Sequence, residues 1–197
     1  MIRTLAWTVA AAIVGERAFA DLRNYDIDTA HSQVVFSFDH HGLSPVTGII
    51  TGVAGKLSFD QEAPATSSVE ASIPSMQLTT GHATQDSDIL SADFLGAEAA
   101  PEVAFRSTKI EVTGADTAFI EGELTLNGIT RSVVLDAVLN HATLSTKGVP
   151  ALGLSGTTTL LRSEYDAGRS APANSDVVRV ALAIEATATP ELDGTGN

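Results

Sequence analysis

The feature that most limits how this chain can fold is a strict alternation of apolar and polar residues in short runs. It is clearest in residues 25–60, where Val34, Phe36 and Phe38 occupy every second position. A period of two is typical of a β-strand with one buried face, because successive side chains point to opposite sides of the sheet. This stretch is therefore predicted to be a β-unit whose apolar surface either packs against protein or holds a ligand.

Similar runs continue to residue 186, with turn signals between them. They are Val34–Phe38, Ile49–Val53, Lys56–Phe59, Val69–Ile73, Val103–Ser107, Lys109–Val112, Ala118–Leu126, Ser132–Asn140, Leu152–Leu161 and Val177–Ala186. A turn is predicted at residues 42–48, and Asn127-Gly128 is a hairpin signal because this pair readily adopts positive φ. Many short strands with frequent turns predict a mainly β fold, either a sandwich or a barrel.

Parity within the longer runs predicts which side chains face inward. The set is Ile120, Gly122, Leu124, Leu126, Val133, Leu135, Ala137, Leu139, Leu152, Leu154, Gly156, Thr158, Leu160, Val178, Val180, Leu182 and Ile184. The opposite parity carries polar groups such as Glu121 and Asp136, so one face is wet and the other dry. Small inward residues, among them Gly122 and Gly156, favour room inside a barrel of about eight strands, which can be filled by side chains or hold one ligand.

One interval lacks the alternation. Residues 80–100 are rich in alanine and acidic residues, with apolar residues at helical spacing. We predict a short helix, or two helical turns, over about Thr84–Leu95, laid across the barrel and ended by Pro101.

The two ends of the chain are predicted to lie outside the folded domain. Residues 1–20 combine Arg3, a short apolar run and the small-residue site Ala18-Phe19-Ala20, which is typical of a signal peptide cleaved after Ala20 and hence of periplasmic export. Residues 189–197 are predicted to be a disordered tail. A single domain occupies residues 21–188, and no later stretch is apolar enough for a membrane span.

Composition excludes several classes of site. There is no cysteine, so disulfides, thiolate nucleophiles and cysteine-based metal centres are ruled out. The formal charge of −13 repels phosphate backbones, which makes a nucleic-acid partner improbable. The sequence GLSGT around Ser155 lacks the final glycine of a nucleophile elbow and lies in a strand pattern, so no catalytic residue is predicted.

Five histidines are present, without the spacing of a known metal motif. Adjacent His40 and His41 would point to opposite sides of a strand and could not readily share one ion. His31 and His40 are interpreted as hydrogen-bonding groups near a barrel mouth, and a metal site assembled from distant histidines stays open.

Several ordered motifs resemble the YceI family of exported bacterial proteins, over residues 25–186. They are YDIDTAHSQVVFSFDHHGLSPVTG (25–48), GKLSFD (55–60), LSADFLGAEAAPEVAFRS (90–107), GELTLNGITRSVVLDAVLN (122–140) and GTTTLLRSEY (156–165). The chain departs from the family pattern at Gln85, Asp88 and Asp166, where arginine, histidine and glycine are usual.

The resemblance implies an antiparallel, lipocalin-like β-barrel that binds a long isoprenoid lipid and needs no cofactor. The ligand-binding residues that it implies are Val34, Phe36, Phe38, Leu57, Phe59, Phe94, Phe105, Leu124, Leu126, Leu135, Leu154 and Tyr165, with His31 and His40 close to the ligand. Members of the family are often dimers, so a homodimer is also implied, although no residue of this sequence indicates an interface.

Three hypotheses follow. The first is a non-enzymatic carrier or store of an isoprenoid, quinone or related amphiphilic lipid. The second is a metal-dependent or hydrolytic enzyme that uses His31, His40 and an acidic partner at the barrel mouth. The third is an envelope stress-response interaction module with a filled core. The volume and lining of the barrel interior would discriminate among them.

Overall fold

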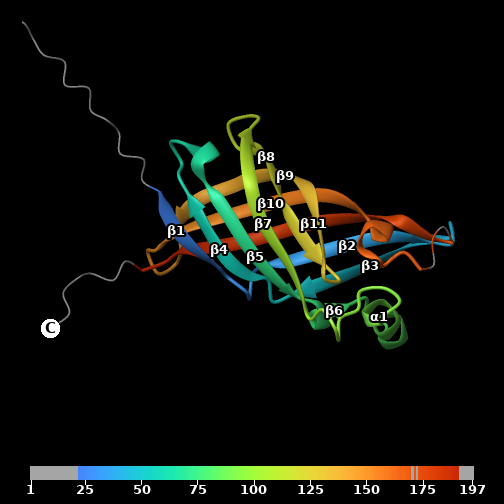
Figure 1. Cartoon of the computed structure of the whole chain (residues 1–197). Coiled ribbons are helices and arrows are strands. Elements are labelled where there is room, and N and C mark those ends of the chain that lie inside the picture. The colour runs from blue at the N-terminus through green and yellow to red at the C-terminus, as the bar shows by residue number, and fades with distance from the viewer. Residues whose placement is uncertain (1–21, 170, 172, 191–197) are drawn as a thin grey trace, which may run out of the picture.

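The computed structural model describes residues 22–190, apart from residues 170 and 172, as one antiparallel sheet that closes into a barrel (Figure 1). Its strands are β1 (Arg23–Ile27), β2 (Gln33–His40), β3 (Ser44–Thr51), β4 (Ala54–Phe59), β5 (Ser68–Pro74), β6 (Leu78–Thr79), β7 (Glu102–Val112), β8 (Thr117–Leu126), β9 (Ile129–Leu144), β10 (Pro150–Leu161) and β11 (Asn174–Ala188). The short helices are η1 (Pro64–Thr66), η2 (Ser75–Gln77), α1 (Ala83–Leu90) and η3 (Arg162–Tyr165). The predicted β-barrel is confirmed.

The ring of the barrel runs β1-β4-β5-β7-β8-β9-β10-β11 and closes where β11 pairs with β1. Strands β2, β3 and β6 extend it at one end, because β2 also pairs with β11, β3 with β2, and β6 with β3. This extension ends at β6, because no ladder joins β6 to β7 in the described residues. Helix α1 lies at this end, which we call the α1 end, and β1 lies at the opposite end (Figure 1).

The break between β1 and β2 has an identifiable cause. Ser32 is buried, and its hydroxyl donates to the Glu185 carbonyl and accepts from the Glu185 N–H. These two bonds substitute for strand pairing while residues 28–32 loop out. The alternation of the sequence does not reveal this break, because β1 and β2 both pair with the same strand, β11.

Two inward glycines are required by aromatic rings packed across the strands. A Cβ atom at Gly48 would lie 2.2 Å from the Phe36 ring, and one at Gly122 would lie 2.4 Å from the Phe105 ring and 2.6 Å from the Arg106 carbonyl oxygen. The expectation that Gly122 leaves room in the interior is therefore wrong, because the Phe105 ring covers this position.

Gly122→Ala is expected to lower the free energy of unfolding by about 1–3 kcal/mol, because the new methyl group overpacks a site bounded partly by backbone. Urea denaturation would measure the change. Gly153→Ala is the matched control, since a Cβ atom there has no neighbour closer than 3.9 Å. Equal stability of the two variants would contradict this account.

The helical segment is shorter than predicted. Helix α1 ends at Leu90, not near Leu95, and Ser91 follows it in extended conformation. The Ser91 hydroxyl donates to the Asp88 carbonyl and so caps the last turn, which means that Pro101 does not end the helix. Residues 92–100 form turns instead, and Phe94 and Leu95 lie among them.

One predicted turn is present as expected, and two other predicted elements differ from the structure. Asn127 and Gly128 form a two-residue loop with φ of 51° and 72°, which confirms the hairpin. The turn predicted at residues 42–48 is confined to residues 41–43, and β3 already begins at Ser44. The runs Val103–Ser107 and Lys109–Val112 are one strand, β7, whose pairing with β8 shifts register between Ser107 and Lys109.

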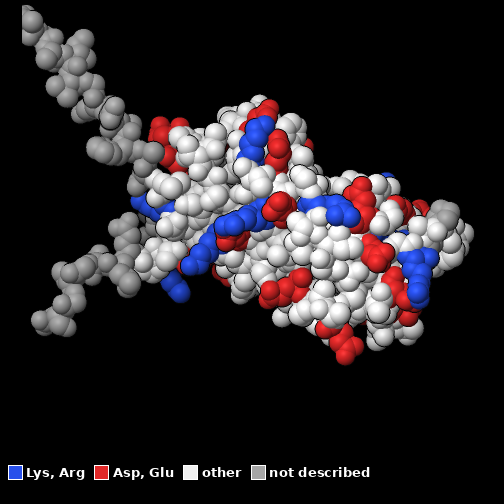
Figure 2. Space-filling view, viewed as in Figure 1, with Lys and Arg blue, Asp and Glu red and all other residues white. Residues whose placement is uncertain are grey.

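Charged side chains of both signs are interspersed on the visible outer face (Figure 2). Arg106 pairs with Glu70, and Lys109 pairs with Glu111 and Glu121 across exposed strand surfaces. Exposed pairs of this kind contribute at most about 1 kcal/mol each to stability.

The predicted signal peptide at residues 1–20, its cleavage after Ala20 and most of the predicted tail lie outside the described residues. Thr189 is held in place, since its N–H donates to the Asn24 carbonyl and its hydroxyl donates to Asp26. No helix in the described part of the chain is both long and apolar enough to cross a membrane.

Candidate ligand-binding site

A cavity of about 330 Å³ lies inside the barrel. It reaches from Ile89 and Phe94 at the α1 end to residues 114–117, in the turn between β7 and β8 and the start of β8, at the opposite end. The volume is in the range of about 300–1,000 Å³ that is usual for ligand pockets. The interior of this barrel is therefore not a filled core.

Strand parity builds the wall of the cavity. In β9 and β10 the inward positions Val133, Leu135, Leu154 and Leu160 line it, while Thr157 and Thr159 face outward. Aliphatic and aromatic side chains supply nearly all of the lining. Such a wall offers an elongated apolar ligand an environment free of water and places few directional demands on it.

Every apolar residue predicted to bind ligand lies on this wall. They are Val34, Phe36, Phe38, Leu57, Phe59, Phe94, Phe105, Leu124, Leu126, Leu135, Leu154 and Tyr165. Neither His31 nor His40 belongs to the lining. Sequence analysis also missed Ile89 and Leu95, which follow no strand pattern, and Arg162.

Arg162 is the cationic residue of the wall and lies at the α1 end. Its guanidinium donates four hydrogen bonds, two to the Ser175 carbonyl and one each to the carbonyls of Asn174 and Ala167, at 2.8–3.1 Å. These bonds fasten the connection between β10 and β11. A sequence signal existed, because Arg162 continues the inward parity of Thr158 and Leu160.

The guanidinium also contacts two aromatic rings. Its central carbon lies 5.7 Å from the centroid of Phe38 and 5.4 Å from that of Phe94. Both distances are within the range of cation–π attraction. Burial lowers the pKa of Arg162, and the negative charge of Asp176 opposes this effect. The residue stays charged at any physiological pH because arginine begins from a pKa above about 12.

Tyr165 ends the same short helix, η3, and is 1% exposed. Its side chain lines the cavity, and its hydroxyl has no hydrogen-bond partner among the described residues. Burial raises the pKa of this phenol, with a further contribution from Glu164. Asp166 follows in left-handed conformation at φ 58°, and aspartate tolerates this region better than most residues.

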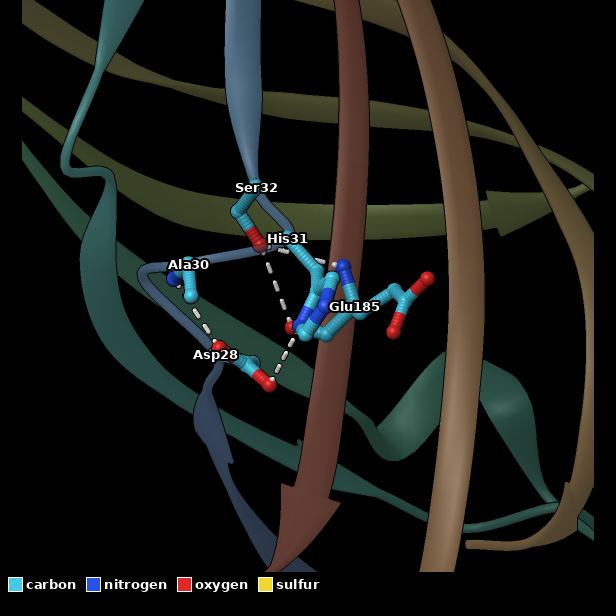
Figure 3. Close-up of polar contacts among 5 residues, drawn as sticks. All are labelled: Asp28, Ala30, His31, Ser32 and Glu185. Carbon is cyan, nitrogen blue, oxygen red and sulfur yellow. Dashed lines mark hydrogen bonds and ion pairs between the residues drawn. The ribbon is translucent and has the colours of Figure 1, made fainter. Parts of the chain in front are cut away.

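His31 belongs to a separate, exposed cluster in the loop between β1 and β2 (Figure 3). Its Nδ1 lies 2.9 Å from Oδ2 of Asp28, whose Oδ1 accepts the Ala30 N–H. Glu185 lies on the other side of the ring, and the three side chains each bring one donor atom within 4.8 Å of the others. Since both Asp28 oxygens already accept hydrogen bonds, we interpret this carboxylate as the cap of the loop.

The Asp28 carboxylate raises the pKa of His31, chiefly through their hydrogen bond, and His31 lowers the pKa of Asp28 by the same bond. The contribution of His31 to the free energy of unfolding is fully present below its unfolded pKa of about 6.5. It is lost as pH rises through the raised pKa of the folded state. The contribution of Asp28 to the free energy of unfolding is present above its unfolded pKa of about 3.9. It is lost as pH falls through the lowered pKa of the folded state.

An NMR titration is expected to show the His31 ring titrating above its ordinary range. Asp28→Asn keeps an oxygen for the Ala30 N–H but removes the charge, so the pKa of His31 should return toward about 6.5. An unchanged titration in Asp28→Asn would show that another group is responsible.

His40 lies far from this cluster. It ends β2, whereas His31 precedes β2, and a strand rises by about 3.3 Å per residue. The two histidines are therefore at opposite ends of an eight-residue strand and cannot share a site. His40 instead packs edge-on against His41, with ring centroids 4.5 Å apart. The enzyme hypothesis that combined His31 with His40 at one mouth is contradicted by this separation.

The closed antiparallel barrel with an apolar interior places the protein in the class of small β-barrels with an internal ligand cavity. The chain belongs to the YceI family, since the YceI-like domain matches residues 25–186. A UPF0312 protein of Ectopseudomonas mendocina is 34% identical over 91% of this chain and 94% of its own length.

Two solved structures share the fold. BcnA of Burkholderia cenocepacia has a TM-score of 0.73 and 18% identity, covering 81% of this chain and 98% of its own. A polyisoprenoid binding domain from Saccharophagus degradans, implicated in plant cell wall breakdown, has a TM-score of 0.61 and 13% identity, covering 85% of this chain and 99% of its own. At these identities the likeness concerns the fold alone.

Proposed function

We propose that this protein binds a long-chain isoprenoid, or a related amphiphilic lipid, inside its barrel and carries or stores it without chemical change. The observation that carries the proposal is a cavity that extends between the two ends of the barrel and has an almost wholly apolar wall. The polyisoprenoid binding domain from Saccharophagus degradans, which has the same fold, supports this class of ligand.

The energetics favour a long apolar chain. Each Å² of apolar surface removed from water contributes about 25 cal/mol, before the costs of association are subtracted. A branched polyene can make such contacts along the whole cavity and needs few polar partners. Binding of this kind does not require a catalytic group, so the protein is proposed to act as a carrier or store rather than as an enzyme.

We place this activity in the periplasm. Support comes from the signal-peptide pattern of residues 1–20 and from the resemblance to exported proteins. A homodimer, which the same resemblance implies, is part of the proposal and is tested by measuring the mass of the purified protein in solution.

The test of function is native mass spectrometry of the purified protein, followed by solvent extraction and identification of the lipid. We expect a stoichiometric adduct that extraction removes, and uptake of an added polyprenyl quinone by the emptied protein. Recovery of no lipid, together with no uptake, would refute the proposal.

A further inference from the structure

The exposed cluster of Asp28, His31 and Glu185 brings together side chains of the types that ligate metal ions. Each supplies one donor atom within 4.8 Å of the other two, and no other group of three histidine, aspartate or glutamate side chains does so in the described residues. None of the three residues lines the cavity. Whatever this cluster binds is therefore bound separately from a lipid inside the barrel.

Hydrogen bonds of the main chain hold the cluster together before any ion binds. The Glu185 carbonyl accepts the Asp28 N–H at 2.8 Å and the Ser32 hydroxyl at 3.2 Å, and the Glu185 N–H donates to the Ser32 hydroxyl oxygen at 3.1 Å. The His31 N–H donates to the Asp28 carbonyl at 3.2 Å. The loop between β1 and β2 is thus fastened to β11 beside the three side chains, so less conformational entropy remains to be lost when an ion binds (Figure 3).

Two of the donor atoms already have nearly the spacing of neighbouring ligands of one metal ion. Nδ1 of His31 lies 2.9 Å from Oδ2 of Asp28. Two ligand atoms that are each about 2.0–2.1 Å from a zinc ion lie about 3.0–3.4 Å from one another. An ion can therefore take the place of the proton between these two atoms. The one proton of the neutral ring is then on Nε2, and any second proton passes to solvent.

The remaining oxygens are compatible with this arrangement. Oδ1 of Asp28 keeps the Ala30 N–H, so Asp28 still caps the loop when its Oδ2 ligates an ion. The Glu185 side chain is exposed, and its carboxylate forms no hydrogen bond or ion pair with the described residues. It is free to turn toward His31 and Asp28 and to supply the third ligand.

Charge and ligand type indicate which ions fit. Two carboxylates and a neutral imidazole carry a charge of −2, which a divalent cation balances. Imidazole is a good ligand for Zn²⁺ and neighbouring transition-metal ions, whereas Ca²⁺ prefers six to eight oxygen ligands and Mg²⁺ keeps several waters. The formal charge of −13 also raises the concentration of cations near the surface.

We propose that Asp28, His31 and Glu185 form a binding site for a divalent transition-metal ion, such as Zn²⁺, on the outside of the barrel. Three protein ligands leave a position for water. The site joins the loop between β1 and β2 to β11, the strand with which both β1 and β2 pair. A bound ion therefore crosslinks the closure of the barrel and stabilises the folded state.

The test is calorimetric titration of the purified, chelator-treated protein with Zn²⁺, and separately with Ca²⁺. We expect one Zn²⁺ per chain, bound at least about tenfold more tightly than Ca²⁺. Glu185→Gln removes one ligand without breaking a hydrogen bond. It should weaken Zn²⁺ binding by at least about tenfold, a loss that is typical even for partners outside the first ligand shell.

Stability provides a second readout. Zn²⁺ should raise the midpoint of urea denaturation of the parent protein and raise that of Glu185→Gln much less, while the two proteins should be equally stable in the presence of a chelator.

Two control variants separate this site from other charges and histidines. Glu123→Gln removes the same charge from an exposed position on β8, and His40→Gln removes a histidine at the opposite end of β2. Both should bind Zn²⁺ as the parent does.

Three outcomes would overturn the proposal. The first is undiminished Zn²⁺ binding by Glu185→Gln. The second is loss of binding in His40→Gln, which would place the ion at His40 and His41. The third is equal affinity for Ca²⁺ and Zn²⁺, which would show general attraction to an acidic surface instead of coordination by His31. None of these outcomes bears on lipid binding, which is tested separately.

Discussion

Replacing Gly156 and Ala137 together by leucine is expected to weaken lipid binding by about a hundredfold. The two residues face each other across β10 and β9, and both line the cavity. Leucine side chains there would occupy the space of the bound chain. Displacing about four methylene groups from the wall corresponds to about 3 kcal/mol, or somewhat more than a hundredfold in Kd.

This substitution is expected to be tolerated by the fold. A Cβ atom at Gly156 would lie 3.5 Å from Leu182 and 3.6 Å from the Asp136 carbonyl oxygen, which is ordinary contact. Thr157→Leu is the control, since the adjacent Thr157 is exposed on the outer face. Displacement of a fluorescent apolar probe by an added isoprenoid lipid measures the Kd of that lipid, and circular dichroism verifies the fold. Undiminished binding by a folded double variant would place the ligand outside the barrel.

Arg162→Met is expected to lower the free energy of unfolding by about 3 kcal/mol. Methionine has a similar length and remains apolar, but it leaves the carbonyls of Ala167, Asn174 and Ser175 without the donors that now satisfy them. The contact of the cation with Phe38 and Phe94 is lost as well. Urea denaturation would measure the loss.

Two further variants make this result specific. Arg162→Lys keeps the charge but loses the planar fork, so it should recover only part of the stability. Arg179→Met removes an exposed arginine from the outside of β11 and should change stability by no more than about 0.5 kcal/mol. If both Met variants were equally stable, the four hydrogen bonds of Arg162 would be energetically unimportant.

Alternation in the sequence predicted the part of the cavity wall that the strands supply. The parity assigned to β8, β9, β10 and β11 is the parity observed, because a shift by one residue would turn every apolar side chain of a strand outward. Phe94 and Tyr165 lie outside any strand. Their place on the wall was expected from family resemblance, not from periodicity.

Three features could not be read from alternation. The break at residues 28–32 depends in part on the two long-range bonds between Ser32 and Glu185, which alternation does not show. The separation of His31 from His40 follows from the extended strand β2, which lies between them. Arg162 is at a position whose parity predicts an inward-facing side chain, but a charged residue at the end of a strand is usually predicted to be exposed to solvent.

The missing ladder between β6 and β7 bears on how fast a lipid can be exchanged. At the α1 end, α1 and the turns that follow it supply Ile89, Phe94 and Leu95 to the cavity wall, and no residue of α1 is fully buried. Asp86 ties α1 to the end of β6 through hydrogen bonds from the N–H and hydroxyl of Thr80. Moving α1 aside would break these bonds and the packing of Ile89 and Leu90 against the core, but it would leave every rung of the closed ring intact. For the lipid that we propose, we therefore expect a residence time that is set by local opening of this segment and that can be short even if the barrel itself unfolds very slowly.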